Sequence, residues 1–259
     1  MGINRKPNQP YSTRASTSAR DRWAPAALLV LAVMGWAWSI SAAGMGGMEG
    51  MARPAGLTDL VGFMLGWVAM MAAMMFPAII PVVRLYALAS AKGSAAPLPY
   101  FVGGYLVVWS AAGLPAWAAW HGLQEPLAAA SPWAGRLAGV ALLAAAVYQL
   151  TPWKTVCLRH CRSPLAFFLH HGRSIGTGLG AARAGVAHGA FCLGCCWLLM
   201  VILVAFGTMH LGWMLALSAL ILLEKTASCG ETVARAAAVA FAALGLLLIL
   251  HPKTLGFLI

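Results

Sequence analysis

The sequence predicts an all-α fold, a polytopic bundle of about seven transmembrane helices with very little chain outside the membrane. Three observations predict it. Apolar residues make up 61% of the 259 residues and charged residues only 9%, against about 25% charged in an ordinary soluble domain. The apolar residues fall into separate runs, most of them close to the roughly 20 residues that a membrane crossing needs. The connectors between these runs are short, which leaves no room for a separate catalytic domain.

Windows of hydropathy place the seven helices in order along the chain. The expected spans are 24–43, 57–86, 100–120, 133–151, 184–206, 210–223 and 233–250. Pro77 and Pro81 are expected to kink the second span. A polar cytoplasmic tail, residues 1–23, precedes a single helical domain over residues 24–259. An uncleaved first helix is favoured over a cleaved signal sequence or an organelle transit peptide, and cleavage would leave six spans.

The distribution of basic residues predicts the orientation in the membrane. Of the 17 Lys and Arg residues, all but Arg53, Arg136 and Lys253 fall on one side of the expected spans. Basic residues collect on the cytoplasmic side, so we expect the amino terminus in the cytoplasm and the carboxyl terminus outside. The same residues explain the net charge of +11 through contact with anionic headgroups of the lipid bilayer. No basic stretch is interleaved with aromatics on a soluble surface, so no nucleic-acid partner is expected.

The fifth expected span carries a dense group of soft metal ligands in the run HGAFCLGCCW. At about 100° per residue, His188, Cys192, Cys195 and Cys196 share one face of a helix over about two turns. No cysteine of the chain falls in an outer loop, which indicates reduced thiols rather than disulfides. Clustered thiols suit Cu(I) or Zn(II). The alternative is that these cysteines are small buried apolar residues.

A second cysteine pair lies in the connector after the fourth span, in the run TPWKTVCLRHCRSP. If this run is helical, Cys157, His160 and Cys161 share a face. The pair lacks the paired spacing of a structural zinc site, so copper is favoured over zinc. It needs further ligands from elsewhere, either Cys229 or the fifth-span group. The alternative is a basic anchor on lipid headgroups, a role that is compatible with metal binding.

Methionines form the third candidate element. In the second span, Met64, Met71 and Met75 fall on one stripe of the helix, and thioethers are ligands for Cu(I). Three more, Met45, Met48 and Met51, are spaced three residues apart in the Gly-rich outer loop. The alternative for the span is that methionine fills gaps in the packed core.

Four segments together resemble a bacterial family of unknown function described as predicted metal-binding integral membrane proteins. The segments are MMAAMMFPAIIP, YQLTPWKTVCLRHCRSP, FCLGCCW and LLEK, and the resemblance covers about residues 57–250. It implies a bacterial inner-membrane location and metal binding, and it implies no established reaction.

Three functions remain open on the sequence. The first is the binding, storage or passage of Cu(I) across the inner membrane, with a metal chaperone as a partner. The second is an accessory or assembly subunit of a larger membrane complex, without chemistry of its own. The third is a thiol oxidoreductase using Cys192 and Cys195. Six acidic residues in the whole chain leave no paired-carboxylate catalyst, so we favour a protein that is not an enzyme. Glu224 is expected to pair with a neighbouring base, Lys225 or Arg235.

Overall fold

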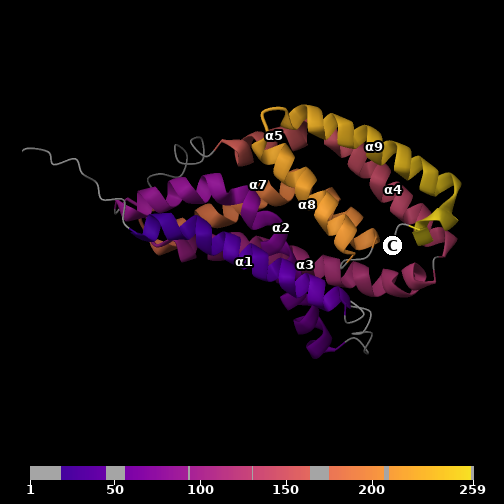
Figure 1. Cartoon of the computed structure of the whole chain (residues 1–259), viewed down its shortest axis with the longest axis horizontal. Coiled ribbons are helices and arrows are strands. Elements are labelled where there is room, and N and C mark those ends of the chain that lie inside the picture. The colour runs from indigo at the N-terminus through magenta and orange to yellow at the C-terminus, as the bar shows by residue number, and fades with distance from the viewer. Residues whose placement is uncertain are drawn as a thin grey trace, which may run out of the picture.

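The computed structural model describes residues 19–44, 56–92, 94–129, 131–163, 175–206 and 210–257. These ranges hold eight α-helices, a short 3-10 helix and no strands. The elements are α1 (Ala19–Gly44), α2 (Leu57–Ala91), α3 (Leu98–Ala128), α4 (Pro132–Gln149), α5 (Pro152–Arg162), α7 (Gly178–Ala205), α8 (Leu211–Thr226), α9 (Gly230–Leu250) and the 3-10 helix η2 (Pro252–Phe257) (Figure 1). The all-α class is therefore confirmed.

The seven expected helices are all present, but fewer of them have the length and apolarity of a membrane span. Five do: α1, α2, α3, α7 and α9. Helices α4 and α5 would make a sixth only as one broken span, because they are bent by 69° where they meet. Helix α8 has 16 residues. These long apolar helices mark the chain as a membrane protein.

Helix α2 is the longest element and lies nearest the centre of the bundle. It continues for 35 residues through both Pro77 and Pro81, so the expected interruption of the second span is not a break. Of its span, 67% is buried, against 22% for α1. Helix α1 instead exposes apolar side chains such as Val30 and Val33, which is the composition of a surface that faces lipid.

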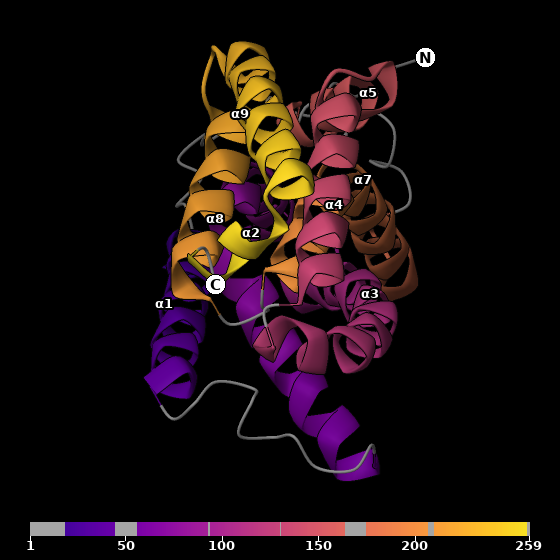
Figure 2. The same ribbon diagram turned by 90° about the vertical axis from the view of Figure 1, so that its right-hand side faces the viewer.

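The helices associate chiefly in three pairs: α1 with α2, α3 with α7, and α4 with α9. Both views show α4 and α9 running side by side, with α8 beside them (Figures 1 and 2). Helix α8 also contacts α2 and α7, so it joins the pairs to one another. Helix α5 packs across α7 and contacts the end of α4 and α8.

Glycines allow α3 and α7 to cross closely. A side chain at Gly185 would collide with the backbone carbonyl of Phe101, and one at Gly104 with the carbonyl of Ala182. Gly189 lies against Tyr105 and Val108 of α3 in the same way. Small residues at helix crossings are typical of membrane bundles. Gly185 and Gly189 thus admit α3 as the neighbouring helix.

Candidate metal centre

Helix α7 buries its entire ligand-bearing face. His188, Cys192, Cys195 and Cys196 are each at most 2% exposed. Thr177 starts the helix, because its side chain accepts a hydrogen bond from the Gly180 amide. From there the spacing of the four side chains turns all of them toward the interior of the bundle. The cysteines are free thiols.

Helix α5 brings Cys161 onto this face of α7. The side chain of Thr151 caps the start of α5, and Pro152 occupies the first helical position, where a missing N–H costs nothing. Cys161 is buried, and its thiol lies next to the thiols of Cys192 and Cys195. The thiol of Cys196 lies next to the same two thiols. We call Cys161, Cys192, Cys195 and Cys196 the thiol group. The sequence placed them in two clusters, and the structure makes them one.

Cys192 is the central member of the thiol group. Its backbone carbonyl accepts hydrogen bonds from the thiols of Cys195 and Cys196, with sulfur–oxygen distances of 3.1 and 3.0 Å. Its own sulfur lies 3.1 Å from the hydroxyl of Tyr105 on α3. The ammonium of Lys225, on α8, donates to the same sulfur at 2.9 Å. Four helices, α3, α5, α7 and α8, therefore meet at one sulfur atom.

The contact with Lys225 also defines the depth of the thiol group along the bundle. Cys192 is in the middle of α7, whereas Lys225 is one residue before the end of α8. Helix α5 reaches the same level, since it carries Cys161. The thiol group therefore lies within reach of the last turn of α8, close to where α8 is followed by α9.

Glu224 does not pair with Lys225 or Arg235, so that expectation was wrong. Its carboxylate accepts from the ammonium of Lys154 at 2.7 Å and from the amide of Gln149 at 2.8 Å. Lys154 and Glu224 have side chains that are both 2% exposed. The reason is the position of α5, which lays Lys154 over the end of α8. Because Glu224 and Lys225 are adjacent in a helix they point to different neighbours, one to α4 and α5 and the other to α7.

The two histidines and Cys157 lie around the thiol group. His188 packs between the rings of Phe101 and Tyr105, with centroid distances of 6.0 and 6.1 Å. The ring of His160 stacks on Phe191, with centroids 3.9 Å apart. Cys157 is half-buried. Its sulfur lies against Gly194, and a Cβ atom added at Gly194 would be 3.0 Å from this sulfur. Cys157 and His160 thus face α7 on the same side of α5 as Cys161.

The other sulfur ligands predicted from the sequence have different positions. Met71 and Met75, on α2, are buried in the core of the bundle, 1% and 0% exposed. They do not belong to the thiol group. The loop of Met45, Met48 and Met51 lies outside the described residues. Cys229 is exposed at the start of α9, so the partners of Cys161 come from α7 and not from Cys229.

The thiol group is a set of donors that must rearrange to hold an ion. Among the described residues, no three His, Cys, Asp or Glu side chains are arranged to hold a metal ion as they stand. The sulfurs are instead engaged with one another and with the Cys192 carbonyl. Binding therefore requires that thiol protons leave and that sulfurs turn toward the ion. Soft thiolates of this kind suit Cu(I), Zn(II) or iron–sulfur clusters.

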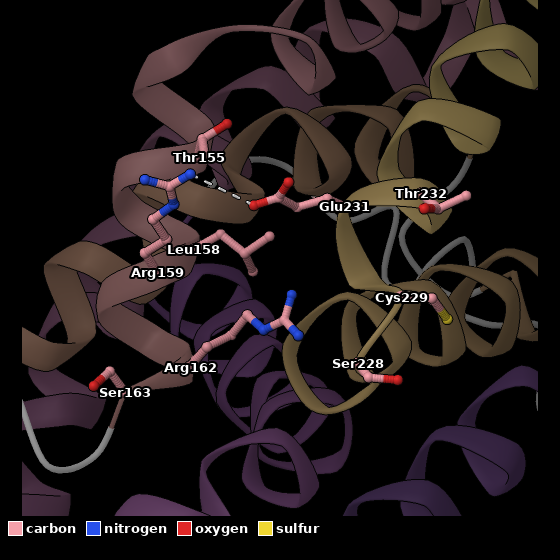
Figure 3. Close-up of a pocket in the computed structure, with 9 residues that line it drawn as sticks. All are labelled: Thr155, Leu158, Arg159, Arg162, Ser163, Ser228, Cys229, Glu231 and Thr232. Atoms are coloured by element: carbon pink, nitrogen blue, oxygen red, sulfur yellow. Dashed lines mark ion pairs between the residues drawn. The ribbon is translucent and has the colours of Figure 1, made fainter.

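A polar cavity of about 510 Å³ lies on the opposite side of α5 from the thiol group. Figure 3 shows Arg162 of α5 pointing into it and Arg159 reaching across to Glu231 of α9, an ion pair of 3.7 Å. Arg162 also donates to the carbonyl of Ala227 in the α8–α9 junction. Helix α5 thus separates a solvent-accessible cavity from the buried sulfurs.

The comparisons with known proteins agree with this chemistry. Residues 64–248 match the PpoB2 family, which is described as a copper chaperone. The match covers most of the chain and includes every member of the thiol group, so the chain belongs to this family. No curated protein and no solved structure matches the chain.

Sequence reasoning missed the role of the two lysines. Lys154 was counted only as a cytoplasmic basic residue, and Lys225 was expected only as a possible partner of Glu224. Both are buried, and they bind Glu224 and Cys192 respectively. A signal was available, because LLEK ends an apolar helix and charged residues inside a membrane protein are costly unless they are paired or functional. The partners themselves could not be predicted, since they come from helices distant in the sequence.

Proposed function

We propose that this protein is a copper chaperone of the bacterial inner membrane, and that it holds Cu(I) between α5 and α7 through thiolates of the thiol group. The observation that carries the proposal is the meeting of Cys161 from α5 with Cys192 and Cys195 from α7. Thiols from two separate helices converge at one buried point, as a soft-metal site requires and as ordinary core packing does not.

Loading exchanges protons for metal. Two thiols of the group release their protons, and the resulting thiolates bind one Cu(I). Cys161 and Cys192 are the pair that joins the two helices, and Cys195 and Cys196 lie close enough to exchange with either of them. Sulfurs of similar affinity at short spacing allow an ion to move between ligands without being released to water. That property is what a protein needs in order to pass copper to a partner.

Further candidate ligands around the thiol group supply a route by which Cu(I) enters and leaves the site. Cys157 and His160 lie on the thiol-facing side of α5, against Gly194 and Phe191 of α7, and extend the set of ligands around the group. Met71 and Met75 provide neutral thioether ligands in α2, suited to a passing Cu(I) ion. In this account the partners are the lipid bilayer and a copper donor or acceptor, which is another metal chaperone or a subunit of a membrane complex.

Seven crossings with a cytoplasmic amino terminus fit the arrangement of charge. The end of α4, helix α5, the end of α8 and the start of α9 meet at one end of the bundle, and Lys154, Arg159, Arg162, Lys225 and Arg235 all belong to it. Positive charge collects on the cytoplasmic side. We therefore place the thiol group toward the cytoplasmic face, where copper must be kept bound by thiolates.

The test is the copper content of the purified protein. Wild-type protein in detergent is equilibrated anaerobically with Cu(I), desalted, and assayed for metal and protein. We expect about one Cu(I) per chain, and a loss of most of it when Cys192, Cys195 and Cys196 are all changed to Ser, because the deprotonated sulfur ligands are gone. Cys229→Ser is the matched control and keeps its copper, since Cys229 is exposed and outside the thiol group.

Two outcomes contradict the proposal. Equal copper in the wild type and the triple variant removes the α5–α7 site. A wild-type protein that binds no Cu(I), but that purifies with larger membrane subunits, favours the assembly-subunit alternative.

A further inference from the structure

Lys225 is a buried positive charge whose nearest partner is a sulfur atom. The residue is 6% exposed, and its ammonium donates to Cys192 at 2.9 Å. The neighbouring acid, Glu224, is already engaged by Lys154 and Gln149. Among the described residues no carboxylate forms an ion pair with Lys225. An ammonium held in an apolar interior without a carboxylate is costly, so its position needs an explanation.

We infer that Lys225 is the counter-ion of the metal–thiolate complex and that it sets the preference of the site for a monovalent over a divalent cation. This inference rests on the proposed function, because it requires the thiol group to bind metal. It adds two points: the charge of the metal ion that the site prefers, and the residue that determines this preference.

The charge balance of the site gives the argument. Lys225 brings one positive charge to the site, with its ammonium 2.9 Å from the Cys192 sulfur. Loading a monovalent ion follows 2 RSH + M⁺ → M(SR)₂⁻ + 2 H⁺, where the thiols lose their protons to solvent. The resulting anionic complex and the Lys225 ammonium then sum to zero. A divalent ion on the same two thiolates leaves one net positive charge, and a buried net charge is penalised.

Coordination geometry closes the remaining route for a divalent ion. Zn(II) could reach neutrality beside Lys225 by taking three thiolates, but it then needs a nearly tetrahedral set of donors. A set of three sulfurs would have to include Cys195 or Cys196, and both of these thiols donate to the Cys192 carbonyl. Cu(I) and Ag(I) have low coordination numbers, and two sulfurs, one from α5 and one from α7, are enough to bind such an ion. Charge and geometry therefore favour the same ions.

The test compares metal selectivity in three proteins. Wild type, Lys225→Met and Lys225→Arg are titrated anaerobically with Cu(I), and separately with Zn(II), against chromophoric chelators of known affinity. We expect Lys225→Met to lose at least about tenfold in Cu(I) affinity, and to lose much less in Zn(II) affinity, so that the ratio of the two falls. Lys225→Arg keeps the positive charge and restores most of the ratio.

Controls separate charge from damage to the fold. Arg159→Met removes a positive charge from the same end of the molecule, but at an exposed side chain (74% exposed), and it leaves both affinities unchanged. Elution as a single detergent-solubilised species shows that each variant is folded. A Lys225→Met protein with the wild-type affinity ratio overturns the inference and leaves the copper site standing. A wild type that binds no Cu(I) overturns the proposed function itself.

Discussion

Cys192 accepts hydrogen bonds at its carbonyl from two thiols and shares its sulfur with side chains of two other helices. Substituting it therefore removes a proposed metal ligand and also disturbs Tyr105 and Lys225. The ion pair of Lys154 and Glu224 lies beside Lys225 and has a structural role. It neutralises two charges that α5 and α8 carry into the interior, and so it fixes α5 against the end of α8.

Breaking this buried ion pair from one side should be costly. We expect Glu224→Gln to destabilise the protein by about 3–5 kcal/mol, because the Lys154 ammonium is left buried without a carboxylate. The measurement is thermal unfolding in detergent. The double variant Glu224→Gln, Lys154→Met should recover part of the loss, since no charge is then stranded.

The exposed pair of Arg159 and Glu231 is the matched comparison. Its side chains are 74% and 52% exposed at a distance of 3.7 Å, and exposed pairs contribute little. Glu231→Gln should therefore leave the unfolding temperature nearly unchanged. An equal loss in both single variants would show that the Lys154–Glu224 pair has no special role.

At the scale of elements, the sequence predicted where the helices lie along the chain, but it did not predict which helices pack against one another. All seven apolar runs became helices, and Cys157, His160 and Cys161 proved to lie on one short helix, because local periodicity reports local structure. Periodicity carries no information about which helices meet. It could not show that α5 bends by 69° from α4 and lays Cys161 on α7, nor that α8 delivers Lys225 to Cys192.

The crossing of α3 and α7 gives a test at this scale, because two adjacent glycines of α3 face different surroundings. A Cβ at Gly104 meets the Ala182 carbonyl of α7, whereas one at Gly103 meets nothing within 4 Å. We expect Gly104→Ala to destabilise by about 1–3 kcal/mol through overpacking and to weaken copper binding, since Tyr105 and its bond to Cys192 move with α3.

Gly103→Ala serves as the control for this substitution. It should be neutral or slightly stabilising, because alanine favours a helix by about 1 kcal/mol over glycine. Thermal unfolding and Cu(I) titration of Gly104→Ala and Gly103→Ala measure the two expected effects, on stability and on copper binding. Similar behaviour of both would mean that the close approach of α3 to α7 does not support the site.

At the scale of the whole molecule, composition was enough to predict a helical membrane protein. The thiols led to the prediction of copper, which agrees with the copper chaperone family to which the chain belongs. The number of spans was not predictable from composition, because α8 is apolar but short and α4 and α5 reach the length of a span only as a bent pair. These shorter elements are the ones that surround the thiol group with charge. The bundle of long helices thus serves as the support, and the short helices at one end carry the residues that complete the site.

The central claim is that one Cu(I) ion bridges α5 and α7 through sulfur. X-ray absorption at the copper edge of the Cu(I)-loaded protein tests it most directly, with Cys161→Ser beside the wild type. We predict a Cu(I) edge with about two sulfur neighbours and no more than a minor nitrogen or oxygen contribution, and a changed sulfur shell in Cys161→Ser. A wild-type spectrum dominated by nitrogen or oxygen, or an identical sulfur shell in the two proteins, would contradict the claim.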